Sequence, residues 1–435
     1  MKHCDKIYAD MLNDLGELIS LDSLLAPSKL NAPFGEKMRT TLDWFITKAK
    51  SYGLTAYEKD GYYGVVEIGD NNSTLNNSKA SDKNNKMFAF AGHLDVVEAG
   101  SSWTVPPFAL TNKDGYLYGR GVVDNKGPAI AVLHVLKALK DSSQKLNHRI
   151  RLIVGCNEES GSLCLKKYAE VDEIPAFTLI PDADFPVIYS EKGIMFLELT
   201  KEMSNDFCKR VSELSFGGAN LNMIPARACA VLDGKEIITT GVAGHAMAPE
   251  LGDNASWKLF SELSGVSADA RLIYDLFCNH NAKKILDIDY NDEVSGELTM
   301  SLNKGELIGK NLKLTFDMRL PICADKDLII SKLEKTFGAK SKVIAYKENL
   351  YIDPDSKLVQ TLLNIYQKQT GDLESQPKKI GGGTYARELP NAIAFGAQFD
   401  RYESNIHNAD EKVSVEHFNK WFDIYYNTVL ELDCM

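Results

Sequence analysis

Residues 87–95, with the sequence MFAFAGHLD, form an apolar run that ends at a histidine and an aspartate. A short apolar run between polar segments is typical of a buried strand, so we predict a strand from Met87 to Gly92. Two later apolar runs, 150–155 and 176–180, have the same form and also precede acidic residues. Helical periodicity over 128–140 lies between the first two runs. Short apolar strands that alternate with helices predict an α/β domain with a mostly parallel sheet.

The sequence pattern changes near residue 195, where strand-like segments become frequent and frame two predicted helices, 255–263 and 268–277. After about residue 345 the first pattern returns, with a predicted helix over 356–369, a glycine-rich turn, a strand over 392–397 and a helix over 415–432. The economical interpretation is one three-layer α/β domain that is split by an insertion. We therefore predict that residues 1–194 and 346–435 form this domain and that residues 195–345 form an inserted α+β domain.

Composition narrows the possible classes of protein. The 435 residues are too many for one ordinary core, and 44% of them are hydrophobic, as in a globular protein. The net charge is −11 without a basic stripe, so we expect no nucleic-acid partner. No apolar run is long enough to span a bilayer and no signal peptide is recognisable, so we expect no membrane partner and a cytoplasmic location. Residues 70–86, rich in Asn, Ser and Lys, predict a surface loop.

The eight cysteines are scattered and form no CxxC pair, so neither a zinc knuckle nor a disulfide framework is expected. Other side chains that can bind metal lie just after the predicted strands or in loops. In an open α/β sheet this carboxyl edge is where ligands bind. Several carboxylates gathered there would repel one another unless cations lay between them. The residues of this set, which match first-row metal ligands, are His93, Asp95, Asp124, Glu158, Glu159, Asp182 and His407.

The spacing of these residues indicates a division of roles. His93 would bind metal through one ring nitrogen, and Asp95, two residues later, can accept the other ring N–H. Asp124 lies in the glycine-rich segment 119–127, where a carboxylate can bridge two ions roughly 3.5–4 Å apart. The adjacent side chains of Glu158 and Glu159 diverge, so one can bind metal while the other acts as general base. We predict a hydrolase with a two-metal site.

The motifs that surround these residues resemble the co-catalytic metallopeptidases, a family that includes aminoacylase, carboxypeptidase G, succinyl-diaminopimelate desuccinylase and the PepV-type bacterial dipeptidases. The resemblance covers nearly the whole chain. It implies a three-layer catalytic domain, an inserted α+β lid domain and two divalent ions, usually zinc, with manganese or cobalt in some members. The motifs are GHLDVV at 92–97, Trp103 with PPF at 106–108, YGRG at 118–121, DNKGP at 124–128, EESGS at 158–162 and PDA at 181–183.

The resemblance also implies a role for each residue of the site. His93 and Asp182 would hold one ion, Glu159 and His407 the other, and Asp124 would bridge them. Glu158 would be the general base and Asp95 would orient His93. One position departs from the PepV-type pattern, because that pattern has a second aspartate where this chain has Asn125. Asn125 can hydrogen-bond but carries no charge.

Further residues bear on the substrate. The resemblance implies that His245 stabilises the oxyanion, although a histidine in this position could also be a simple turn residue. Asn222 and Arg319 match substrate-binding positions, while a local turn bond and a surface salt bridge stay open as their other interpretations. In the segment GGGTYAR at 381–387, glycines such as Gly382 and Gly383 let backbone N–H groups approach an anion. Arg387 offers a fork that matches a carboxylate.

In the PepV-type branch the GGGTYAR segment helps to bind the C-terminal carboxylate of a dipeptide, so we predict a dipeptidase with small peptide substrates. An N-acyl-amino-acid deacylase or desuccinylase is the alternative on the same fold. A non-catalytic binding scaffold is the alternative of another class. The resemblance further favours a monomer over a homodimer, because the insertion is larger than the small dimerising kind.

Overall fold

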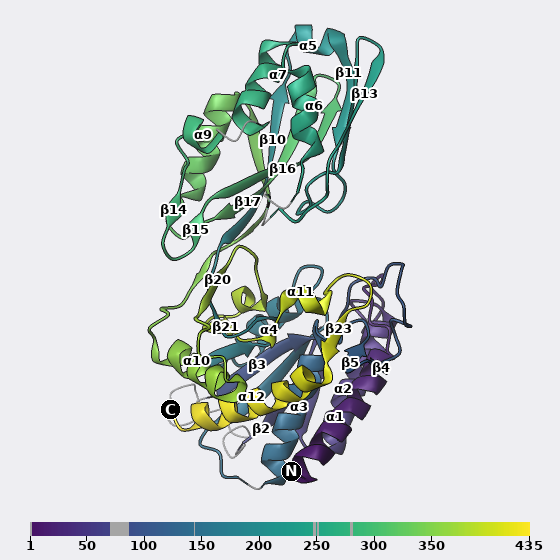
Figure 1. Ribbon diagram of the computed structural model, residues 1–435, viewed down its shortest axis with the longest axis vertical. Coiled ribbons are helices and arrows are strands. Elements are labelled where there is room, and N and C mark those ends of the chain that lie inside the picture. The colour runs from purple at the N-terminus through teal and green to yellow at the C-terminus, as the bar shows by residue number, and fades with distance from the viewer. Residues whose placement is uncertain (1, 70–86, 143, 247–248, 250–251, 279–281) are drawn as a thin grey trace. The chain divides into compact units, whose positions relative to one another are not determined.

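The computed structural model describes residues 2–69, 87–142, 144–246, 249, 252–278 and 282–435 (Figure 1). The predicted loop 70–86 lies outside this part of the chain. Two compact units are present, and each is described by itself. Unit 1 consists of Met1–Tyr189, Ile352–Lys378 and Thr384–Met435, and unit 2 of Ser190–Tyr351 and Lys379–Gly383. The insertion was expected at 195–345, and the inclusion of 379–383 in unit 2 was not foreseen.

Unit 1 is built on a mixed sheet in the order β1-β2-β6-β3-β7-β21-β9. The four central strands run parallel, and β3 and β6 are buried along their whole length, as apolar runs predict. The predicted α/β class with a mostly parallel sheet is thereby confirmed. The strands are β1 (Thr55–Lys59), β2 (Tyr63–Ile68), β3 (Met87–His93), β6 (Arg149–Gly155), β7 (Phe177–Ile180), β9 (Ile188–Glu191) and β21 (Ala392–Ala394).

Small strands flank this sheet and frame the loops of the site. Strand β23 (Lys412–Ser414) pairs with β5 (Tyr116–Tyr118), which pairs with β4 (Thr111–Lys113). Strand β8 (Ala183–Asp184) runs parallel to β22 (Ala397–Gln398). The short strands β19 (Leu350–Tyr351) and β20 (Lys378–Ile380) lie where the chain passes from one unit to the other.

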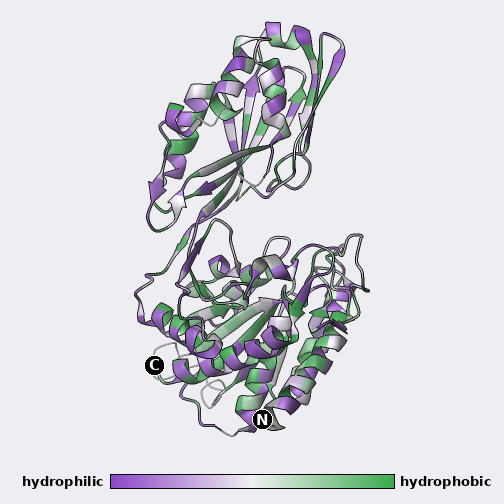
Figure 2. Cartoon of the chain, in the orientation of Figure 1, coloured by the Kyte–Doolittle hydropathy of each residue, from purple (hydrophilic) through white to green (hydrophobic). Residues whose placement is uncertain are grey.

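Helices of unit 1 cover the sheet with their apolar sides, and Figure 2 shows hydrophobic residues concentrated on the central strands. Helix α3 packs against α1 and α12. It begins at Lys126, two positions before the predicted 128–140 helix, because a proline such as Pro128 is compatible with a first turn. The helices are α1 (Lys2–Ile19), α2 (Glu36–Ser51), α3 (Lys126–Asp141), α4 (Leu163–Val171), α10 (Lys357–Thr370), η3 (Tyr385–Glu388), α11 (Arg401–Ser404) and α12 (Val415–Asp433).

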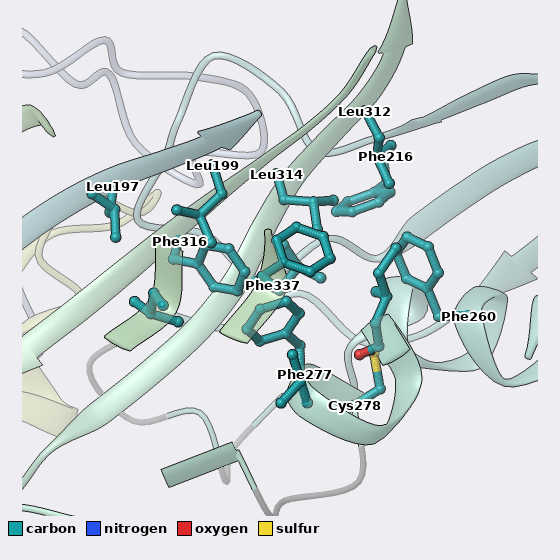
Figure 3. Packing of buried hydrophobic residues seen from close by; sticks show 14 of the residues in the cluster. Leu197, Leu199, Phe216, Phe260, Phe277, Cys278, Leu312, Leu314, Phe316 and Phe337 are labelled. Carbon is teal, nitrogen blue, oxygen red and sulfur yellow. The ribbon is translucent and has the colours of Figure 1, made fainter. Parts of the chain in front are cut away.

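Unit 2 contains an antiparallel sheet in the order β13-β12-β11-β16-β17-β10-β18, so the predicted α+β class is confirmed. Its own core includes Phe277, Phe316 and Phe337, and the ring of Phe277 contacts the rings of the other two (Figure 3). The longer strands are β10 (Gly193–Glu202), β11 (Val211–Phe216), β12 (Arg227–Leu232), β13 (Lys235–Thr240), β16 (Thr299–Ile308), β17 (Asn311–Leu320) and β18 (Lys340–Lys347), with the short β14 (Asn291–Asp292) and β15 (Gly296–Glu297).

Helices of unit 2 pack on this sheet. The helix predicted over 268–277 is divided, because a π-helical turn, η2, continues α7. Among all helices of the described residues, none is both long and apolar enough to cross a membrane. The unit 2 helices are α5 (Asn205–Arg210), α6 (Ala255–Leu263), α7 (Ala268–Ile273), η2 (Tyr274–Cys278), α8 (Ala282–Ile285) and α9 (Lys326–Phe337).

Candidate metal centre

Five side chains of unit 1 meet at the carboxyl ends of the parallel strands. His93 is the last residue of β3, and Asp182 lies between β7 and β8. Glu159 follows β6, while Asp124 lies between β5 and α3 and His407 between α11 and β23. Because β3, β6 and β7 are neighbouring parallel strands, their carboxyl ends share one edge. The fold thus gathers residues that are more than three hundred positions apart in sequence.

Asp124 lies between the two histidines. Its Oδ1 is 2.8 Å from Nε2 of His93, and its Oδ2 is 2.9 Å from Nε2 of His407. Asp182 lies 3.7 Å from the same nitrogen of His93, and Glu159 lies 3.1 Å from that of His407. Two ligand atoms of one tetrahedral ion, each at roughly 2.0–2.2 Å, would be about 3–3.5 Å apart. The four distances between the imidazole nitrogens and the carboxylate oxygens are therefore close to those expected for pairs of ligands that bind the same ion.

Two groups of residues could each hold an ion, because within each group the ligand atoms all lie within 4.8 Å of one another. One consists of His93, Asp124 and Glu159, and the other of His93, Glu158 and Asp182. Glu159 Oε1 is buried without a hydrogen-bond partner among the described residues, so it is an acceptor that a cation would satisfy. These donor atoms, imidazole nitrogens and carboxylate oxygens, suit zinc and similar first-row ions.

The electrostatics of the cluster also fit cations. Burial raises the pKa of Glu158 well above its usual range, against the opposing charge of His93. Burial and the charge of Asp124 raise the pKa of Glu159 to about 7 and also raise that of Asp182. Shifts of this kind arise when carboxylates lie close together out of water, and positive charge between them removes the cause. The residues present therefore fit a metal centre.

The two adjacent glutamates differ in their contacts. Glu159 Oε2 faces His407, whereas the carboxylate of Glu158 makes no hydrogen bond to any residue that the structure describes. Their main-chain N–H groups both donate to Asp95, at 3.0 Å for Glu158 and 3.1 Å for Glu159. One buried carboxylate thus fixes the turn from which both side chains diverge.

The contact of Asp95 with His93 differs from the expected one. Nδ1 of His93 lies 2.9 Å from the main-chain oxygen of Asp95, while the nearest carboxylate oxygen is 3.5 Å away. A carbonyl oxygen can only accept, so Nδ1 carries a proton and Nε2 faces Asp124. The Asp95 main chain therefore orients the ring, and its carboxylate is occupied by the Glu158–Glu159 turn.

Asn125 links the end of β3 to the loop between β7 and β8. It is fully buried; its Nδ2 donates to the Pro181 oxygen at 2.6 Å and to Asp182 Oδ1 at 3.3 Å. Its Oδ1 accepts from the main-chain N–H of His93 at 3.3 Å. An aspartate in the ionised state has no N–H for the first two bonds. The departure from the PepV-type pattern at this position therefore supplies donors as well as removing a charge.

Two buried residues to which sequence analysis assigned no role also belong to this centre. The ring of Tyr385 packs edge-on to His93, with centroids 6.0 Å apart, and its hydroxyl lies 2.7 Å from Sγ of Cys164. Glu411, in the loop that carries His407, is fully buried and binds the loop that carries Asp124. Neither contact could be found by spacing along the chain. Arg120 is buried as well and needs a carboxylate partner, which Glu411 provides.

The predicted substrate residues are divided between the units. Within unit 2, Asn222 Nδ2 lies 3.3 Å from Nε2 of His245, and the main-chain oxygen of Asn222 accepts from Ala246. Arg319 is buried and forms a two-point ion pair with Asp317, at 2.7 and 2.8 Å. The open interpretation of Arg319 as a surface salt bridge is wrong, because the pair is buried.

The segment GGGTYAR spans the boundary of the units. Gly382 and Gly383 belong to unit 2, and Arg387 belongs to unit 1, in the short helix η3. The side chain of Thr384 caps this helix by accepting from the main-chain N–H of Ala386. Nη1 of Arg319 donates to the oxygen of Gly381 at 3.2 Å, so the glycine run is anchored within unit 2.

Known proteins resemble this chain along its whole length. "Putative dipeptidase YtjP" of Bacillus subtilis (strain 168) is 30% identical over 97% of both chains. "Putative dipeptidase SH1171" of Staphylococcus haemolyticus (strain JCSC1435) is 29% identical, also over 97% of both. Human carnosine dipeptidase 1 shares the fold with a TM-score of 0.62 at 15% identity, over 100% of this chain and 98% of that one. The di-peptidase Dug1p of Saccharomyces cerevisiae does so with 0.61 at 13%, over the same shares.

A family model covers most of the chain. The model described as "Peptidase family M20/M25/M40" matches residues 89–431, a range that contains all five residues of the candidate metal centre. The chain belongs to peptidase family M20/M25/M40 and is a metallopeptidase, as the resemblance of its motifs implies.

Proposed function

We propose that this metallopeptidase is a dipeptidase with two divalent metal ions. The observation that carries the proposal is the position of Asp124, whose two carboxylate oxygens face the two histidines, at 2.8 and 2.9 Å. A single carboxylate with one oxygen toward each of two ligand sets is suited to bridge two ions. The names of the relatives from Bacillus subtilis and Staphylococcus haemolyticus support the substrate class.

The ligand sets follow from the contacts of Asp124. His93 and Asp182 would hold one ion, Glu159 and His407 the other, and Asp124 both. Zinc suits imidazole and carboxylate ligands, and manganese or cobalt would also fit. When bound, such ions would polarise a carbonyl group and would lower the pKa of a water molecule that they bind toward neutral pH.

Glu158 is proposed as the general base. Its carboxylate lies beside Asp182 and His93, has no competing hydrogen bond within the described chain, and is held at its backbone by Asp95. A carboxylate in this position can accept the proton of the attacking water and return it to the leaving nitrogen. Hydrolysis of the peptide bond then consumes one water and releases two amino acids, so the proton balance closes.

We propose roles in substrate recognition for the residues that the sequence resemblance assigned to it. Arg387 would pair with the C-terminal carboxylate of a dipeptide, and backbone N–H groups at Gly382 and Gly383 would assist. His245 would stabilise the oxyanion, supported by its contact with Asn222. Arg319, whose guanidinium is held by Asp317, would bind the substrate backbone.

The test is hydrolysis of a dipeptide panel by purified protein, together with its metal content. For Glu158→Ala we expect two ions per chain and a kcat lower by about three orders of magnitude or more, since a general base typically contributes 10²–10⁴-fold. Glu170→Gln on α4 is the matched control, because Glu170 is solvent-exposed.

Near-normal dipeptide turnover by Glu158→Ala would contradict the assignment of the base. If the wild-type protein cleaved N-acetyl or N-succinyl amino acids and left dipeptides intact, the proposed substrate class would be wrong and the deacylase or desuccinylase alternative would take its place.

A further inference from the structure

Glu411 has an unusual concentration of donors around its carboxylate. Oε2 accepts from Nη1 of Arg120 at 2.8 Å and from the main-chain N–H of Gly121 at 2.9 Å. Oε1 accepts from the main-chain N–H of Val123 at 2.9 Å and of Asp124 at 3.1 Å. Both Glu411 and Arg120 are buried, so this ion pair is shielded from solvent. One side chain therefore holds nearly the whole loop that ends in the proposed bridging ligand.

The same side chain belongs to the loop that carries His407. Glu411 immediately precedes β23, whose Lys412 pairs with Tyr118 of β5. The main-chain oxygen of Glu411 accepts from Gly119 at 3.1 Å, and Nη2 of Arg120 donates to the oxygen of Asn408 at 3.0 Å. Loop 119–124 and loop 405–411 are therefore joined at both ends of the Glu411–Arg120 ion pair.

The loop of His407 needs such an anchor. His407 has a φ of 64°, and Asn405 and Asp410 are also left-handed, at 54° and 58°. This conformation is uncommon for residues other than glycine, although Asn, Asp and His adopt it more readily than most, so three such residues in one loop depend on contacts that hold them. The side chain of His407 is also 51% exposed, so packing holds it only in part.

We infer that Glu411 is a positioning residue that sets His407 against Asp124 and thereby assembles the ligand set of the second metal ion. The inference rests on the proposed two-metal function. Glu411 itself does not face the ligand cluster, because both of its oxygens are already occupied by four donors. It acts by holding the loop of His407 against the loop that ends in Asp124.

A glutamine cannot replace this carboxylate. Each oxygen of Glu411 accepts two bonds, whereas a glutamine has only one oxygen. Its NH₂ group would therefore face two donors, either Arg120 and Gly121 or Val123 and Asp124. Asp410, in the same loop, provides the matched control. Thr104 donates to it from its main-chain N–H and from its hydroxyl, and both bonds end on the same carboxylate oxygen, Oδ1. An asparagine at 410 retains that oxygen and tolerates a left-handed φ.

The experiment titrates metal-free protein with Zn²⁺ against a chromophoric chelator, for wild type, Glu411→Gln, Asp410→Asn, His407→Ala and the double variant Glu411→Gln/His407→Ala. For Glu411→Gln we expect the weaker of the two sites to lose at least about tenfold in affinity, as removal of a group that supports a metal ligand typically does. Asp410→Asn should bind like wild type. In the His407→Ala background, Glu411→Gln should add less than about threefold to the loss, because Glu411 acts through His407.

Wild-type affinity of both sites in Glu411→Gln, or a full additional loss in the His407→Ala background, would overturn the inference and leave the proposed function intact. A wild-type protein that bound fewer than two ions would overturn both.

Hydrogen exchange of the wild type keeps the inference testable if Glu411→Gln does not fold. The amides of Val123 and Asp124 should be protected in folded, metal-free protein, since Glu411 rather than metal holds them. Rapid exchange of these two amides in folded metal-free protein would overturn the inference.

Discussion

At the scale of single residues, the centre depends on acceptors that hold main-chain N–H groups. Asp95 binds the N–H groups of Glu158 and Glu159, one with each oxygen, and its main chain orients His93. The ring orientation and the glutamate turn thus depend on different atoms of Asp95. A substitution that changes only the side chain can separate the two.

For Asp95→Asn we expect zinc affinity to fall about tenfold to one hundredfold, because the amide can accept from only one of the two N–H groups. The Nδ1–H tautomer of His93 should be unchanged, since its acceptor is a main-chain oxygen. Competition with a chelator measures the affinity, and long-range ¹H–¹⁵N NMR reports the tautomer. A changed tautomer with unchanged affinity would show that the carboxylate orients the ring.

Sequence reasoning grouped four of the five proposed ligands because each lies in a recognisable motif, and it added His407 as the histidine of a late loop. His93 and Asp182 follow apolar runs whose direction along a parallel sheet is predictable. The bonds of Asp95 and Glu411 were not predictable, because their partners are main-chain groups whose position depends on how two distant loops fold. Side-chain type and spacing carry no information on such contacts.

At the scale of elements, one buried carboxylate joins three helices of unit 1. Asp14 of α1 accepts from Lys48 of α2 at 3.0 Å and contacts Nε2 of His134 of α3 at 2.8 Å. The hydroxyl of Tyr52, just after α2, bonds to the same carboxylate. Burial acts to raise the pKa of Asp14, but the bonds with His134, Tyr52 and Lys48 outweigh it and lower the pKa below 3.8. The ionised form is therefore the one that stabilises the fold.

Asp14→Asn should lower the free energy of unfolding of unit 1 by about 2 kcal/mol at pH 7. The reason is that Lys48 and His134 would lose their carboxylate partner. A carboxyl whose folded pKa is depressed contributes stability above its unfolded pKa and loses it as the pH falls below about 3.8. The difference between variant and wild type should thus shrink toward that pH. Urea unfolding of metal-free protein at neutral and acidic pH measures it.

Asp10→Asn is the matched control, because Asp10 lies on α1 like Asp14 and pairs with Lys137 of α3 at a more exposed position. Its cost should be within about 1 kcal/mol at any pH. Equal costs for the two variants, or a cost of Asp14→Asn that grows on acidification, would contradict the role given to Asp14.

Element boundaries show where local sequence signals are sufficient. Helix α12 begins after Ser414, whose side chain accepts from His417 N, and the predicted start at Val415 is correct. The helix predicted at 268–277 could not be resolved into α7 and the π-helical η2, because apolar spacing does not distinguish a π-turn from an α-turn.

At the scale of the whole molecule, all five proposed metal ligands lie in unit 1, and unit 2 has a core of its own. Ions that bind only the folded state stabilise it by mass action, by about 4 kcal/mol when the ligand is at one thousand times its dissociation constant. This stabilisation should act on unit 1 alone.

Removal of metal by a chelator should therefore lower the unfolding temperature of unit 1 by several degrees and leave unit 2 unchanged. Hydrogen exchange followed by mass spectrometry resolves the two, with peptides from β3 and β6 reporting on unit 1 and peptides from β16 and β17 on unit 2. Equal loss of protection in β16 and β17 would show that metal binding extends to unit 2, contrary to the proposed ligand set.

The split of unit 1 around unit 2 also bears on how the protein is made. Synthesis proceeds from the N-terminus, so His93, Asp124, Glu159 and Asp182 leave the ribosome before the insertion, and His407 leaves long after it. Strand β21, which lies between β7 and β9 in the finished sheet, is also among the last segments to emerge. A nascent chain therefore has only part of the ligand set and an unfilled place in its sheet until the C-terminal segment is complete.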